Sequence, residues 1–78
     1  MSIQEQYQRY KIEIDKIKNN LSAKHGIPIE ELDDLIENVR QIKFKELDLV
    51  VKKTHDYKVH RLLTLASINA GTEYNLSL

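Results

Sequence analysis

The chain has 78 residues, of which 41% are hydrophobic and 31% are charged, and its formal net charge is zero. One domain fits this length, the apolar content excludes a disordered chain, and two glycines and one proline are too few for an all-β fold. The lack of cysteine excludes disulfide bonds and thiolate chemistry, and no apolar run approaches the roughly 18 residues of a membrane span. These features predict a soluble, cytoplasmic, all-α protein.

The first predicted helix covers residues 2–25. Ser2 can act as its N-cap, and Glu5, three residues later, completes a capping box. His25 in the last turn and Gly26 directly after it are typical of a helix C-terminus. Apolar residues recur at alternating steps of four and three, which is the spacing of a heptad seam. The predicted seam consists of Ile3, Tyr7, Tyr10, Ile14, Ile17 and Leu21.

Polar residues flank this seam, so another helix must cover it. The cover can come from residues 29–42 of the same chain, from a second copy, or from a different protein. Nearly three heptads are too few to indicate a coiled coil by themselves. The sequence favours packing within the chain and leaves the intermolecular interpretations open.

The second predicted helix covers residues 28–53. Pro28 suits the first helical position, and Glu30 and Glu31 favour the positive end of the helix dipole. No Gly, Pro or Asn lies between Arg40 and Ser67, which favours a helix that continues to Lys53. One apolar stripe follows helical spacing, namely Ile29, Leu32, Leu35, Ile36, Val39 and Ile42. The alternative is a strand in this stretch, because Ile42 and Phe44, and then Leu47, Leu49 and Val51, recur at every second position.

The third predicted helix covers residues 56–70. Thr54 or Asp56 can cap it, and Gly71 is a good stop. Its apolar stripe consists of Val59, Leu62, Leu63, Ala66 and Ala70. Because no strong breaker precedes it, the second and third helices could instead form one rod of about forty residues. The tail, residues 72–78, is expected to be frayed or loosely docked, with an added extended segment as the alternative.

The fold expected for residues 1–71 is a single small antiparallel helical bundle or a long helical hairpin, with two to three helices. At this size a chain buries only about 60% of its unfolded surface, so a dimer or higher oligomer is expected. The first core layer should place the seam against the stripe of the second helix. The third helix should cover that layer with Val59, Leu62, Leu63 and Ala66.

No motif for catalysis or cofactor binding occurs in the sequence. The serines lack the glycines of a nucleophile elbow, and there is no Gly-rich phosphate loop. The carboxylates of residues 30–34 suit a helix start better than general acid–base chemistry. Asp56 and His60, with His55 nearby, are too few for a zinc site. We therefore expect neither an enzyme nor a catalytic residue, metal, cofactor or small-molecule substrate.

A basic stretch within residues 40–61 supports a second hypothesis. Basic side chains neutralise phosphates and exposed aromatic rings stack on bases, and Phe44 and Tyr57 lie in this stretch. Acidic residues interrupt it, however, and the isoelectric point near 6.8 is low for a nucleic-acid-binding domain. The candidate contacts are Arg40, Lys43, Lys45, Lys52, Lys53, Lys58 and Arg61.

The leading functional hypothesis is a non-catalytic protein-interaction module that acts as an adaptor, inhibitor or regulatory subunit through an amphipathic helical face. Its partner is another protein, a second copy, or both, and no membrane is involved. The two halves of the chain differ in charge. Residues 1–39 hold five basic and eight acidic side chains and residues 40–78 hold seven and four, so head-to-tail self-pairing is one possibility. A nucleic-acid-binding regulator is the alternative.

Overall fold

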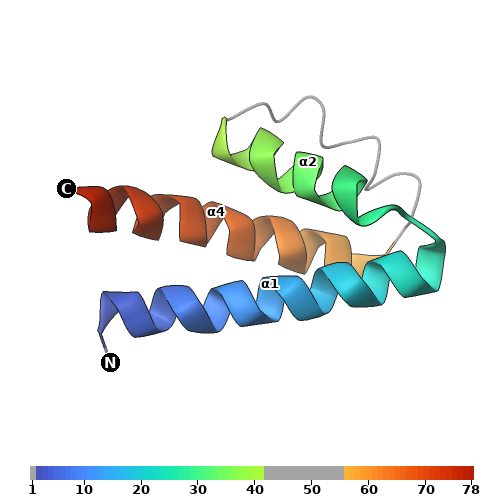
Figure 1. Ribbon diagram of the computed structural model, residues 1–78, viewed down its shortest axis with the longest axis horizontal. Coiled ribbons are helices and arrows are strands. Elements are labelled where there is room, and N and C mark those ends of the chain that lie inside the picture. The colour runs from blue at the N-terminus through green and yellow to red at the C-terminus, as the bar shows by residue number, and fades with distance from the viewer. Residues whose placement is uncertain (1, 42–55) are drawn as a thin grey trace.

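The computed structural model describes residues 2–41 and 56–78 of the chain. These residues form three helices, α1 (Ile3–His25), α2 (Ile29–Arg40) and α4 (Tyr57–Ser77), and no strand occurs among them. Figure 1 shows α1 and α4 side by side, with α2 lying over the half of this pair that is distant from both chain ends. The all-α class predicted from composition is confirmed for the described residues.

Helix α1 begins and ends where its capping residues predict. The Ser2 side chain accepts a hydrogen bond from the Glu5 backbone N–H at 3.1 Å. At the other end Gly26 has a φ of 66°, a left-handed conformation that glycine adopts at little cost. The Gly26 N–H then donates to the Ser22 carbonyl at 2.9 Å, which satisfies one of the unpaired carbonyls of the last turn.

Helix α2 is shorter than its apolar pattern predicts. Pro28 precedes the first helical residue, and the helix ends at Arg40 rather than at Lys53. Gln41 closes it with a φ of −90° and a ψ of 7°, and its N–H donates to the Glu37 carbonyl. Residues 42–53, together with the alternating stretch considered as a strand, lie outside the described residues.

The single rod joining the second and third helices is excluded. Arg40 Nη2, at the end of α2, lies 2.8 Å from Glu73 Oε2 near the end of α4. In one continuous helix these residues, 33 positions apart in sequence, would be separated by about 50 Å. The helices α2 and α4 therefore pack beside each other.

Helix α4 continues through Gly71 to Ser77, so the prediction of a stop at Ala70 followed by a frayed tail is wrong. A glycine inside a helix costs only about 1 kcal/mol relative to alanine, which neighbouring interactions can offset. The ion pair with Arg40 holds Glu73, and the Thr72 hydroxyl donates to the Ile68 carbonyl at 3.0 Å. Gly71 does not adopt the positive φ that would end the helix.

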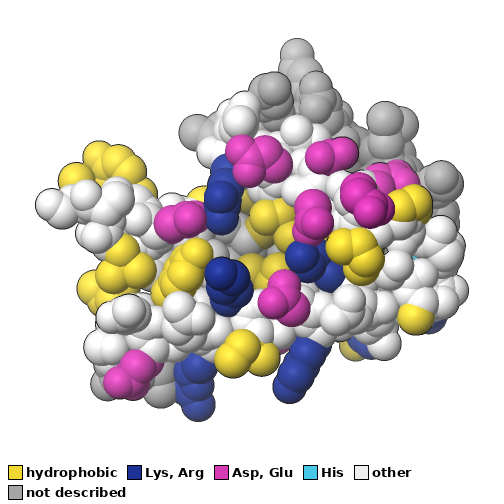
Figure 2. All heavy atoms as spheres, viewed as in Figure 1, with side chains coloured by type: hydrophobic (Ala, Val, Ile, Leu, Met, Phe, Trp, Pro, Cys, Tyr) yellow, Lys and Arg dark blue, Asp and Glu magenta, His cyan; other side chains and the backbone are white. Residues whose placement is uncertain are grey.

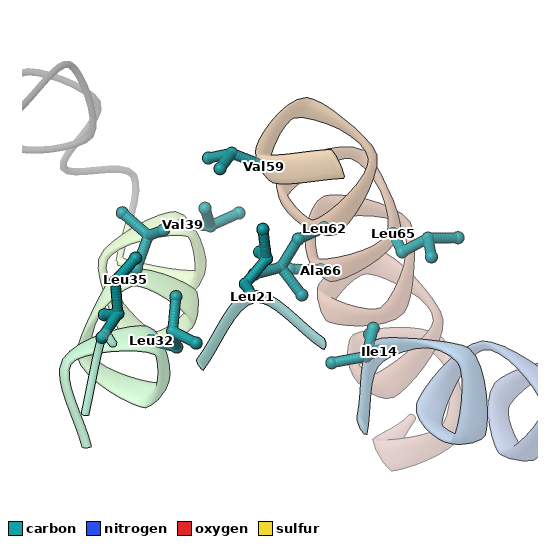
Figure 3. Packing of buried hydrophobic residues seen from close by; sticks show 10 residues of the cluster. Ile14, Leu21, Leu32, Leu35, Val39, Val59, Leu62, Leu65 and Ala66 are labelled. Atoms are coloured by element: carbon teal, nitrogen blue, oxygen red, sulfur yellow. The ribbon is translucent and has the colours of Figure 1, made fainter. Parts of the chain in front are cut away.

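The core lies where all three helices meet (Figure 3). Leu21 of α1 and Leu62 of α4 are fully buried and point toward each other, and Leu32, Leu35 and Val39 project from α2. The principal neighbour of α1 is α4 rather than α2, so the expected first layer is wrong in this respect. The buried apolar residues are Ile14, Leu21, Ile27, Leu32, Leu35, Val39, Val59, Leu62, Leu65 and Ala66, with Tyr10, Ile17, Ile36 and Leu63 packed against them.

Neither α1 nor α4 contains an apolar stretch long enough to cross a bilayer, and the same holds for α2.

Candidate interaction surface

The heptad seam of α1 is covered along only part of its length. Ile14 and Leu21 are buried, and Tyr10 and Ile17 pack against the core as partly buried residues. Toward the N-terminus Tyr7 is half-buried and Ile3 is 53% exposed. Within residues 2–41 and 56–78, the chain thus covers this seam at one end and leaves it exposed at the other.

The length of α2 explains why the seam residues are buried toward the C-terminal end of α1 and exposed toward its N-terminus. Helix α1 has 23 residues and α2 has 12, which correspond to about 34 Å and 18 Å of helix. Because α2 starts beside the C-terminal end of α1, it covers only half of the α1–α4 pair (Figure 1). At the other half, where Asn69 of α4 contacts Tyr7 of α1, only these two helices are present among the described residues.

Apolar side chains at this half continue the core stripes past the end of α2. Ile3 lies eleven residues before the buried Ile14, and Leu76 lies fourteen residues after the buried Leu62, so each stays near the core-facing side of its helix. Leu76 is 46% exposed, and Tyr74, which projects from a different side of α4, is 66% exposed. We call the apolar residues at this end of the α1–α4 pair the open end, defined as Ile3, Tyr7, Tyr74 and Leu76. Figure 2 shows hydrophobic side chains gathered over it.

The surroundings of the open end on α4 are almost free of charge. From Leu62 to Leu78 the only charged side chain is Glu73, and that carboxylate is paired with Arg40. The exposed positions of this part of α4 hold Thr64, Ser67, Ile68, Gly71 and Asn75 in addition to the tyrosine and leucines. In a chain with 31% charged residues such a surface is unusual, and depletion of charge is typical of the centre of a protein interface.

A polar residue lies between the two helices next to the open end. Asn69 is only 6% exposed, and its Nδ2 donates a long hydrogen bond of 3.4 Å to the Tyr7 carbonyl. Its Oδ1 is buried without a hydrogen-bond partner. A buried acceptor that lacks a donor costs about 1–3 kcal/mol, so the α1–α4 packing is less stable here than at Leu62.

The opposite end of the pair is held by a buried carboxylate. Asp56, the N-cap of α4, accepts from the Lys58 backbone N–H at 2.9 Å, from His25 Nε2 at 2.9 Å and from Lys24 Nζ at 3.1 Å. The hydrogen bond from His25 is the main cause that holds the pKa of Asp56 well below its ordinary value, and the bonds from Lys58 and Lys24 add to it. Asp56 thus ties the end of α1 to the start of α4.

The contacts of Asp56 also bear on the zinc site that was considered for Asp56, His60 and His55. Asp56 precedes the first turn of α4, and its carboxylate is engaged by α1 and by its own helix, which separates it in role from the exposed His60. No group of three or more potential metal ligands occurs within residues 2–41 and 56–78, and His55 lies outside those ranges. The contacts of Asp56 indicate a structural junction.

Ser22 and Asp33, which belong to the serines and carboxylates considered as catalytic candidates, have structural contacts. The Ser22 hydroxyl donates to the Ile27 carbonyl at 2.6 Å, which fixes the turn between α1 and α2. Asp33 accepts from Lys18 Nζ at 2.6 Å, and this bond is the main cause that raises the pKa of Lys18. Glu30, Glu31 and Asp34 are exposed on α2.

The structure describes three of the seven candidate nucleic-acid contacts, and each has a polar partner. Arg61 Nε lies 3.1 Å from Glu13 Oε1, and Lys58 Nζ donates to Asn20 Oδ1 at 2.9 Å. Arg40 reaches α4 at Glu73, which is about 18 Å of helix beyond Arg61, so the three do not form one cluster. The other four, Lys43, Lys45, Lys52 and Lys53, lie outside the described residues.

A shallow depression of about 350 Å³ lies between α1 and α4 beside two of these cations. Tyr57 lines it and is 76% exposed, and Lys16, Lys58 and Arg61 border it. Among the described residues of the basic stretch, an exposed aromatic ring and cations occur together here, although Glu13, the partner of Arg61, also lines the depression.

The chain was also compared with known proteins. No protein-family model, curated protein or solved structure matches it.

Proposed function

We propose that this chain is a small non-catalytic interaction module, an adaptor, inhibitor or regulatory subunit that docks its open end on another protein. The observation that carries the proposal is that the core stripes of α1 and α4 continue past the end of α2 and remain exposed there. Large apolar side chains that extend a core face without cover are typical of protein-binding sites.

The energetic gain from covering this surface is adequate for recognition. Burying a leucine or isoleucine side chain fully contributes about 1.5–3 kcal/mol, and the exposed parts of Ile3 and Leu76 offer about half of that each. Tyr74 adds an aromatic ring, the side-chain type most enriched at interface hot spots. The uncharged surroundings on α4 lower the desolvation cost, since few ions must lose water.

A matched pair of isoleucines on α1 tests this proposal. Ile3 and Ile12 are 53% and 56% exposed, but Ile12 lies off the heptad seam on the outer face of the helix. In quantitative affinity capture, Ile3→Glu should lose proteins that the wild type and Ile12→Glu retain. A glutamate in the first turn favours the helix dipole, so folding should persist. If Ile3→Glu keeps every captured protein, the open end is not the docking surface.

The depression at Tyr57 supports a second candidate function, binding of single-stranded nucleic acid. Base stacking on an aromatic ring contributes about 1–3 kcal/mol, and nearby cations neutralise phosphates. Retention on single-stranded DNA or RNA should be strongest at low salt and should fall steeply as salt rises. Tyr57→Ala should weaken it about tenfold or more, whereas Tyr74→Ala, a control at the open end, should not. No retention at low salt removes this candidate.

A further inference from the structure

We infer that a single strand of nucleic acid lies along the groove between α1 and α4, which takes a run of about four to six nucleotides. This inference rests on the second candidate function and extends its site beyond Tyr57. The depression at Tyr57 has a neighbour of about 390 Å³, and the two share Glu13 in their lining. The neighbouring depression is lined by Gln6, Arg9, Tyr10 and Glu13.

Both depressions lie on the side of α1 that adjoins α4. Gln6, Glu13 and Asn20 recur at steps of seven residues, or two helical turns, so they share one side of the helix. Glu13 and Asn20 contact Arg61 and Lys58 of α4. The groove therefore follows α1 over fourteen residues, which is about 21 Å. At about 3.4 Å for each nucleotide of a stacked strand, this length holds about six nucleotides, and fewer of an extended strand.

Basic side chains outnumber acidic ones along this groove. Its lining contains four cations and one carboxylate, in a chain whose net charge is zero. The carboxylate is that of Glu13, and its pairing with Arg61 at 3.1 Å offsets its repulsion of an anion. A positively charged groove of this kind follows the phosphates of a single strand. The four cations are Arg9, Lys16, Lys58 and Arg61.

Aromatic rings in both depressions favour nucleic acid over an acidic peptide. Tyr57 is 76% exposed in one of them, and the partly buried Tyr10 lines the other. Every nucleobase has a flat face that stacks on an exposed ring, whatever the base sequence. Aspartate and glutamate side chains offer charge alone, so they would leave the Tyr57 ring unused. The ligand is therefore a single strand bound with little base preference.

Fluorescence anisotropy with labelled oligothymidylate and oligouridylate tests the inference on the intact chain. Affinity at low salt should rise with length up to about four to six nucleotides and change little beyond. Equal affinity of the two series indicates recognition of phosphate and base alone, whereas tighter binding of oligouridylate adds a contact to the ribose hydroxyl. Both results support the inference. The logarithm of the binding constant should fall with the logarithm of salt concentration by about 0.7 for each contacted phosphate.

Two lysines on α1 provide a matched pair of variants. Lys16 lines the groove, whereas Lys11, five residues earlier, lines neither depression and projects from another side of the helix. Lys16→Gln should weaken binding about fivefold at low salt and make the salt dependence shallower by about 0.7. Lys11→Gln should change neither quantity. Circular dichroism melts of both variants should match the wild type, because both lysines are exposed.

Arg9→Gln tests the extent of the site. It should weaken binding of a hexanucleotide and leave binding of a dinucleotide at Tyr57 unchanged. A hexanucleotide that binds this variant as tightly as the wild type overturns the extended groove, while the candidate function at Tyr57 stands. No binding at any length overturns both, and the docking proposal still depends on Ile3→Glu. An oligoglutamate peptide that competes as well as an oligonucleotide of equal charge overturns the nucleic-acid assignment.

Discussion

Leu62→Ala should remove most of the stability of the protein. Leu62 is fully buried where α4 meets both other helices, and it points toward the fully buried Leu21 (Figure 3). Shortening a buried leucine to alanine costs about 2–5 kcal/mol, because contacts are lost and a cavity remains. Native domains have only about 5–15 kcal/mol in total, and short chains lie at the lower end. Urea unfolding should show a midpoint near zero denaturant.

Leu63→Ala is the matched control for this prediction. It makes the same chemical change one position along α4, at a side chain that is only partly buried against the core. Its cost should be about half that of Leu62→Ala or less, because fewer contacts are lost and solvent fills the space. Equal midpoints for the two variants would show that Leu62 does not occupy the centre of the core.

Acidification should weaken the junction at Asp56, the second large effect expected. Its pKa is lowered in the folded protein from an ordinary value near 3.8, so ionised Asp56 stabilises the fold above that pH. The contribution is lost as the pH falls below the ordinary value toward the folded one. The groups that face this carboxylate are His25, Lys24 and the Lys58 backbone. At neutral pH, Asp56→Asn should lower the melting temperature by roughly 5 °C, because asparagine still caps the helix but lacks the negative charge that pairs with Lys24 and strengthens the bond from His25.

Thermal melts of the wild type and Asp56→Asn between about pH 3 and pH 7 check this sign. Other carboxylates titrate in the same range, so the informative quantity is the difference between the two proteins. The melting temperatures should differ most near neutral pH and begin to converge as the pH falls below about 4. A difference that stays constant over this range would show that the charge of Asp56 adds nothing to its role as a cap.

The ends of α1 could be predicted because local chemistry determines them. Ser2 supplies an acceptor for an unpaired backbone N–H, and Gly26 supplies the left-handed residue that the chain needs after the last turn. The ends of α2 and α4 depend on tertiary contacts instead. No breaker marks Arg40, and the pairing of Arg40 with Glu73 joins residues far apart in sequence.

Tertiary contacts also determine which residues of the candidate interaction surface are exposed. The spacing of the heptad seam identifies its members, but which of them are covered depends on how far α2 extends. The prediction also missed Leu65, which is fully buried. Helix α4 packs against both α1 and α2, so its buried face is wider than one stripe. The sequence pattern does not reveal that Asn69, a polar residue on that face, is buried.

The short length of α2 also divides the molecule energetically. Among the described residues, the half where the three helices meet has the dense apolar packing, whereas the other half consists of α1 and α4 with exposed apolar residues and the unsatisfied Asn69. We therefore expect local opening to start in the second half, before the global unfolding that opens the first. If a partner docks there, as we propose, it has to order this half as well as cover it, and part of the binding free energy is spent on that ordering. The proposal thus predicts that recognition is coupled to folding in this half only.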